Sequence, residues 1–196
     1  MTTDSLFNCL SKPDFLAMRG LANEVPIFIH AYDPAREDDA RQTASSLDRG
    51  LNANGIPART IDLFELVLER LDADKRLTPI IEREPQLGKV KLLAMLRGLT
   101  DPSSGAILAA LRERLDASDV RITLIVGVGR VYPFLRTHTV LEAIQPAMTR
   151  HPIVLFFPGR YLQTREGSQL QLFGADVNPP LSRAYYRAIN LSDYCR

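Results

Sequence analysis

The sequence is poor in the residues that build metal sites and disulfide frameworks. It contains two cysteines, three histidines and no tryptophan in 196 residues. Cys9 and Cys195 lie near opposite ends of the chain, and neither has a histidine or another cysteine close by. The two cysteines therefore predict neither a disulfide framework nor a metal site. We expect free thiols, as in a cytoplasmic protein, and no bound metal.

Long apolar runs are also missing. None approaches the roughly 18 residues that a membrane-spanning helix needs. The first 20 residues lack a basic segment followed by a continuous apolar one, so they do not predict a secretory signal. The composition, 45% apolar and 24% charged, is typical of a globular protein. We expect one domain over residues 1–196, with a helical extension at 1–24.

Lysine is scarce and arginine is not. There are 24 basic residues, and only four of them are lysines. Residues 121–196 hold nine arginines and four acids, whereas residues 1–120 have a net charge of −4. Arginine suits paired contacts with carboxylates or phosphates, although genomic base composition gives the same bias. A net +5 over the last part is too small to indicate a nucleic-acid-binding surface.

Apolar runs alternate with amphipathic segments, which predicts an α/β fold. The run 25–34 is a strand that stops at Asp33-Pro34, a good start for a helix that ends at Asn54-Gly55. A second strand at 56–63 follows, and then a helix at 64–77. This β-α-β order predicts parallel strands with a right-handed crossover.

The rest of the chain continues the alternation after a helical middle part, which we interpret as an insertion at 73–119. We expect a three-layer α/β sandwich with a mainly parallel sheet and extra short edge strands at the C-terminus. The further expected elements are helices at 89–99, 106–115 and 133–148, core strands at 120–128 and 152–159, and edge strands at 168–174 and 184–191.

The carboxyl ends of parallel strands lie along one edge of the sheet, where α/β proteins usually bind ligands. We call this edge the rim. The expected strands end in polar residues, which the rim would bring together. They are His30, Tyr32, Asp33, Asp62, Arg130, Tyr132 and Arg160.

A pair of glycines after the third core strand raises the question of phosphate binding. Gly127 and Gly129 begin a G-x-G-x-x-G pattern, but Tyr132 takes the place of the third glycine. No G-x-x-x-x-G-K-[ST] loop is present. We interpret Gly127 and Gly129, like Gly159, as turn residues set by backbone geometry, with an anion cradle as the alternative.

The sequence contains no recognisable catalytic constellation. It has no G-x-S-x-G elbow for a nucleophilic serine. Four aspartates at positions 33, 38, 39 and 62 offer magnesium ligands, but acids at the start of a helix also complement its dipole. We therefore expect a protein that is not an enzyme and has no cofactor.

Tyrosine and arginine together are typical of protein interfaces, and aromatic side chains can also stack single-stranded bases. We interpret the candidates here as partner-binding residues. They are Tyr32, Asp33, Arg130, Tyr132, Arg136, His138, Arg160, Tyr161, Tyr186 and Arg187.

Several stretches resemble a known family in the same order along the chain. The most specific are GVGRVYPFLRTHTVL (127–141) and PIVLFFPGRY (152–161), with Tyr32-Asp33-Pro34, LQLFG (170–174) and YYRAI (185–189) in support. Together they resemble the BrxB family of bacteriophage exclusion (BREX) defence systems, over residues 25–191.

The resemblance implies a small non-catalytic member of an anti-phage operon whose products methylate host DNA and block phage replication. Its implied partners are the larger proteins of that system, first the alkaline-phosphatase-like PglZ and then the PglX methyltransferase. DNA would be reached only through the complex. An adaptor is therefore the leading hypothesis. The alternatives are a degenerate nucleotide- or nucleic-acid-binding module and a magnesium-dependent nuclease using Asp33 and Asp62.

Overall fold

The computed structural model describes residues 1–21, 25–99, 105–116, 119–145, 151–164, 167–173 and 188–195. Its centre is a sheet with the strand order β2-β3-β4-β1-β6, and every neighbouring pair along that order is parallel. β5 pairs with β4 antiparallel, outside that path. The strands are β1 (Ile27–Tyr32), β2 (Ala58–Asp62), β3 (Ile122–Val126), β4 (Ile153–Thr164), β5 (Gly167–Leu172) and β6 (Ile189–Asn190).

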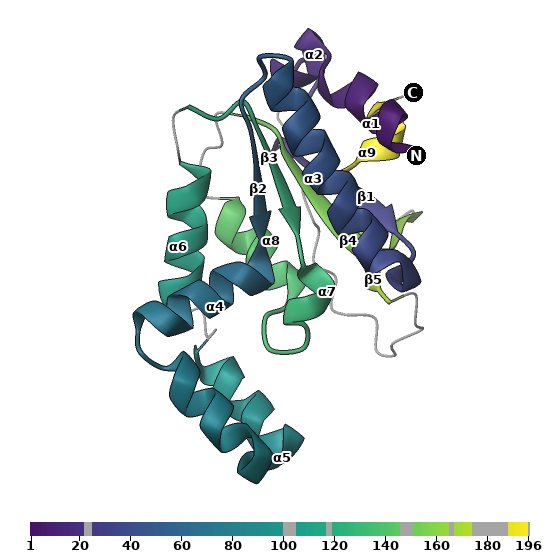
Figure 1. Ribbon diagram of the computed structural model, residues 1–196. Coiled ribbons are helices and arrows are strands. Elements are labelled where there is room, and N and C mark those ends of the chain that lie inside the picture. Colours follow the sequence, from purple (N-terminus) through teal and green to yellow (C-terminus); the bar gives the residue numbers. More distant parts are fainter. Residues whose placement is uncertain are drawn as a thin grey trace.

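Helices cover both faces of the sheet, so the expected three-layer α/β architecture is confirmed (Figure 1). One face carries α1 (Thr3–Leu10), α2 (Pro13–Leu16), α3 (Glu37–Ala53) and α9 (Leu191–Tyr194). The other carries α4 (Leu63–Ala73), α6 (Ala106–Leu115), α7 (Val128–Val131) and α8 (Thr137–Ile144), with α5 (Leu77–Leu99) below them. None of the helices in the described residues is long and apolar enough to cross a membrane.

The two cores follow from side-chain alternation along the strands. In β1, Ile27 and Ile29 pack into the core beneath α4, while Phe28 between them packs beneath α3. All five residues of β3 are buried, as a strand covered on both faces requires. β2 is the edge strand and is more polar, and its Thr60 hydroxyl donates to Asp48 of α3 at 2.7 Å.

The first β-α-β unit matches its sequence signals. Asp33 caps a 3-10 turn (Pro34–Arg36) by accepting the Ala35 N–H at 3.0 Å, and α3 follows directly. Asp62 caps α4 in the same way. A short polar side chain at these positions satisfies backbone donors that the first helical turn leaves open.

The expected helix at 133–148 is wrong in its start. A short helix, α7, begins immediately after Gly127, and α8 begins only at Thr137. Gly127 has φ +81°, which turns the chain at once and buries Val128 and Val131. The Tyr132–Pro133 peptide bond between the two helices is cis.

The C-terminal edge strands are confirmed in part. β4 continues past the parallel sheet and pairs with β5. β5 begins one residue before the strand expected at 168–174 and ends two residues before the expected end. The strand expected at 184–191 is present as β6, which has two residues and pairs with Phe28 and Ile29. Residues 174–187 are outside the described residues, and so are residues 100–104 between two of the expected helices.

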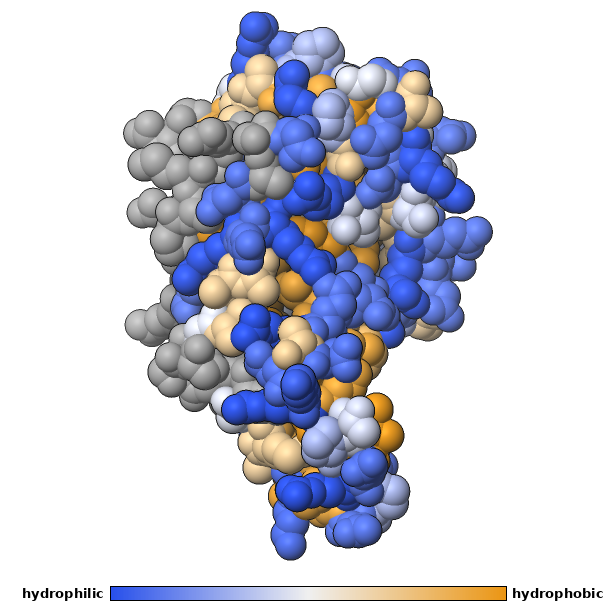
Figure 2. All heavy atoms as spheres, turned by 60° about the vertical axis from the view of Figure 1, so that its left-hand side comes forward, coloured by the Kyte–Doolittle hydropathy of each residue, from blue (hydrophilic) through white to orange (hydrophobic). Residues whose placement is uncertain are grey.

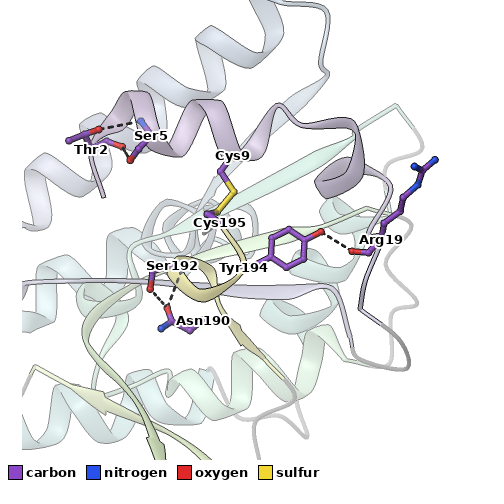
Figure 3. Close-up of a disulfide and its surroundings, with 8 residues drawn as sticks. All are labelled: Thr2, Ser5, Cys9, Arg19, Asn190, Ser192, Tyr194 and Cys195. Carbon is purple, nitrogen blue, oxygen red and sulfur yellow. Dashed lines mark hydrogen bonds between the residues drawn. A yellow bond between two sulfur atoms is a disulfide. The ribbon is translucent and has the colours of Figure 1, made fainter.

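The expectation of free thiols is wrong. Cys9 of α1 and Cys195 after α9 form a disulfide across a sequence separation of 186 residues (Figure 3). β6 joins the edge of the sheet beside β1, and this places α9 against the N-terminal helices. Tyr194 packs edge-on against Phe15 and Phe28, and its hydroxyl donates to the Arg19 carbonyl at 2.8 Å. Spacing along the chain gave no sign of this proximity.

A candidate interaction site at the rim

Asp62, the last residue of β2, organises one half of the rim. Its Oδ1 accepts the backbone N–H groups of Phe64 at 2.9 Å and Glu65 at 3.3 Å, which holds the carboxylate at the start of α4. Its side chain is only 13% exposed. A carboxylate with little access to water needs compensating positive charge, and two arginines provide it.

Arg130 and Arg41 both contact the other oxygen of Asp62. Arg130 Nη1 lies 2.8 Å and Arg41 Nε 3.3 Å from Asp62 Oδ2. The Arg130 guanidinium also stacks over the Phe64 ring at 4.3 Å and lies 3.4 Å from Glu65 Oε1. Arg130 is thus held by three groups of its own chain, which fix the position of its guanidinium at the rim.

Gly127 explains why the phosphate-like pattern does not make a phosphate site. A Cβ atom at Gly127 would lie 2.6 Å from Asp62 Oδ1 and 3.4 Å from the Leu63 nitrogen. The space beside the glycine turn therefore holds a carboxylate of the protein itself. An anion bound there would face like charge, and Arg130 is already paired with Asp62. The interpretation of Gly127 as a turn residue agrees with this geometry.

The other half of the rim centres on Glu37 and Tyr32. The Tyr32 hydroxyl donates to Glu37 Oε2 at 2.5 Å, while Glu37 Oε1 is buried without a hydrogen-bond partner among the described residues. Burial raises the pKa of Tyr32 well above its ordinary value, and Glu37 and Asp62 add to the effect. Tyr32 therefore stays neutral and acts as a fixed donor.

Gly129 lets three segments meet at this point. A Cβ atom there would lie 3.1 Å from Pro158 Cγ and 3.3 Å from both Glu37 Oε2 and Phe173 Cε1. Gly159 has an even stricter requirement, because its Cβ would lie 1.9 Å from the Gln171 carbonyl oxygen. Both glycines are needed for close packing with distant segments, whereas the sequence interpreted them as turn residues set by backbone geometry; Gly129 lies within α7.

An exposed aromatic pair lies beside this junction. Tyr132 and Phe173 pack edge-on with ring centroids 5.5 Å apart, yet their exposed fractions are 40% and 42%. The Phe173 N–H donates to the Pro158 carbonyl at 2.8 Å, which fixes Phe173 next to the end of the parallel sheet. Two neighbouring aromatic rings that remain in water are typical of a surface that a partner covers.

The remaining predicted site residues are distributed more widely. Asp33 is exposed and caps its turn, and Arg136 is exposed at the start of α8, where His138 is half-buried. Arg160 is exposed on the extension of β4, whereas the Tyr161 hydroxyl donates to the Ala188 carbonyl at 3.0 Å. Tyr186 and Arg187 lie outside the described residues.

His30 does not belong to the open rim. Its ring packs edge-on against Phe156 with centroids 5.0 Å apart. Burial lowers the pKa of His30 to about 4, and the positive N-terminal amino group acts in the same direction. His151 is buried just before β4, and its Nε2 lies 2.9 Å from the Thr123 hydroxyl.

Sequence reasoning missed four residues that shape the rim. Glu37 and Arg41 belong to α3, Glu65 to α4, and Phe173 follows β5. The first three follow a capped helix start closely, so their positions next to the rim were open to prediction from the helix boundaries. No group of three histidine, cysteine or acidic side chains is positioned to hold a metal ion within the described ranges.

Comparison with known proteins identifies the family. The family model described as "BREX protein BrxB" matches residues 59–191, which is more than half of the chain. The chain belongs to the BrxB family. A BREX protein BrxB from Bacillus cereus (strain H3081.97) is 31% identical over 195 residues, covering 97% of this chain and 95% of the relative. One from Escherichia coli O9:H4 (strain HS) is 25% identical over 182 residues, covering 93% and 86%.

No solved structure matches the chain. The BrxB family match includes Asp62, Arg130 and Tyr132 but begins after Tyr32 and Glu37. The resemblance recognised in the sequence is confirmed at the level of the family.

Proposed function

We propose that this BrxB-family chain is a non-catalytic adaptor of a BREX anti-phage system, acting in the cytoplasm. It binds a larger BREX protein, first of all a PglZ-type protein, with a PglX-type methyltransferase as the second candidate. The rim is the docking surface. The observation that carries this assignment is the exposed pair Tyr132 and Phe173 beside the end of the sheet.

The polar side chains of the rim are engaged in contacts within the chain, which supports a binding role rather than catalysis. Asp62 is paired with Arg130 and Arg41, and the Tyr32 hydroxyl is committed to Glu37. A general base or a metal ligand needs an accessible lone pair, whereas these groups use theirs to hold the strand ends and helix starts together. What the rim offers to a partner is the aromatic pair together with exposed Arg136 and Arg160.

The test measures the affinity of the purified chain for the PglZ-type protein. Interface aromatic residues often contribute about 2 kcal/mol each, so Tyr132→Ala with Phe173→Ala is expected to weaken binding by roughly 100-fold or more. Arg160→Glu is expected to weaken it as well. The matched control is Arg49→Glu, an exposed arginine near the far end of α3, roughly 18 Å along the helix from Glu37.

Unchanged affinity in the folded aromatic double variant would show that the rim is not the docking surface. The nucleic-acid alternative makes a different prediction, since binding through arginines weakens steeply with salt. DNA or ATP binding at low salt that Arg160→Glu abolishes would favour it. The nuclease alternative requires Asp62 as a metal ligand, so full anti-phage defence in Asp62→Asn would exclude it.

A further inference from the structure

The helical hairpin formed by α5 is the part of the described chain with the least burial. α5 is interrupted at Gly88, which has φ +67° and lies between two helical halves. Leu77 and Ile80 near its start and Leu96 near its end all pack against the core beneath α4. Both ends of α5 therefore return to the body, and the hairpin projects away from it, as Figure 1 shows.

Apolar side chains on this hairpin remain in water. No described side chain of α5 is fully buried, and Ile81 and Val90 are 56% and 84% exposed. Figure 2 shows the hairpin as a separate lower lobe on which hydrophobic and hydrophilic surface alternate. Ordering 23 residues that bury so little apolar surface is unfavourable unless something else covers them.

The charges of the hairpin are uneven. Its second half, from Lys89 to Leu99, contains Lys89, Lys91 and Arg97 and no acidic residue. Lys89 and Lys91 are exposed and flank Val90, and neither takes part in an ion pair within the described residues. The whole hairpin has four basic and two acidic side chains. Two copies of it would repel each other by net charge.

We propose that the α5 hairpin is a second docking surface, which binds an amphipathic helix with acidic flanks from a partner protein. An apolar helix face covers Val90, and carboxylates beside that face pair with Lys89 and Lys91. Lys89, Val90 and Lys91 are not among the rim residues, and the proposal does not rest on the adaptor function. The second surface gives the chain two faces and thus the means to hold two protein segments at once.

The experiment places a photoreactive benzoyl-phenylalanine at Val90 in the full-length chain, within cells that express the complete defence operon. Mass spectrometry identifies the cross-linked peptide. The expected adduct is with an acid-flanked amphipathic segment of another protein of the operon. Lys89→Glu with Lys91→Glu is expected to reduce it at least tenfold, whereas Arg49→Glu leaves it unchanged. Ser45, exposed on α3, provides the control position for the photoreactive group.

Three results would overturn the proposal. The first is an adduct with a second copy of the chain, which would make the hairpin a self-association surface. The second is a cross-link yield at Val90 that is no higher than the yield at the control position Ser45. This result overturns the proposal whether or not the chain sediments together with phosphatidylglycerol vesicles. The third is an adduct that survives charge reversal at Lys89 and Lys91. Loss of rim binding in the Tyr132 and Phe173 variant bears on the rim alone.

Discussion

Reduction of the Cys9–Cys195 disulfide is expected to lower the free energy of unfolding by several kcal/mol. The bond closes a loop of 186 residues, almost the entire chain. In the chain-entropy model, closing a loop of this length raises the free energy of the unfolded state by about 5 kcal/mol. This is large compared with the roughly 5–15 kcal/mol by which most domains are stable.

The folded state itself should change little on reduction. Leu191 is fully buried, Tyr194 packs against both Phe15 and Phe28, and the Tyr194 hydroxyl is bonded to the Arg19 carbonyl. These contacts keep the C-terminal segment docked without the bond. Reduction therefore acts by lowering the free energy of the unfolded state. A loss of about 5 kcal/mol in the free energy of unfolding corresponds to a fall in Tm of about 12 °C for a chain of this size.

The assay is urea unfolding followed by far-ultraviolet circular dichroism, with and without reductant, and with the thiols counted by alkylation and mass spectrometry. The variant Cys9→Ser with Cys195→Ser should match the reduced protein and should not respond to reductant. A difference below about 1 kcal/mol between the oxidised and reduced proteins would refute the loop-entropy argument. A reductant effect on the double-serine variant would show that something other than this bond is responsible.

Two further predictions concern single residues. Gly127→Ala should lower the free energy of unfolding by about 1–3 kcal/mol, because residue 127 has φ +81° and the new Cβ would lie 2.6 Å from Asp62 Oδ1. Gly55→Ala is the control for backbone strain alone, since Gly55 has φ +74° and its Cβ would meet no atom within 4 Å. The pKa of His30, about 4 when folded and near 6.5 when unfolded, means that the unfolded state binds more protons in between. Stability should therefore fall as pH drops from 6.5 towards 4, and His30→Gln, followed by urea unfolding, should flatten that part of the pH profile; an unchanged profile would place the acid sensitivity elsewhere.

Much of the fold could be predicted because its signals are local. Apolar runs located β1, β2, β3 and the parallel part of β4, and the order of strands and helices indicated parallel pairing. Asp33 was predicted as a helix cap because a short acceptor before a proline is typical of a helix start, and the structure confirms that position. Because the carboxyl ends of parallel strands lie at one edge of the sheet, the residues at the rim could then be predicted.

The site was less predictable because its key contacts join distant segments. Arg130 was placed at the rim from the end of its strand, but its contact with Asp62, 68 residues away in the sequence, was not predicted. Phe173 was not among the predicted site residues, and its place beside Tyr132 depends on the β4–β5 hairpin. The path of the chain between strand and helix decides which rim residues pair internally and which stay exposed.

The sequence by itself determined the alternation of strands and helices, the parallel sheet, the chain turn at Gly127, and the family to which the chain belongs. Those properties depend on periodicity, on backbone geometry and on motifs a few residues long. Only the tertiary structure decided that Cys9 meets Cys195, that Asp62 fills the space beside Gly127, and that Val90 stays in water. These depend on packing between elements far apart in the chain, where local preference carries no information.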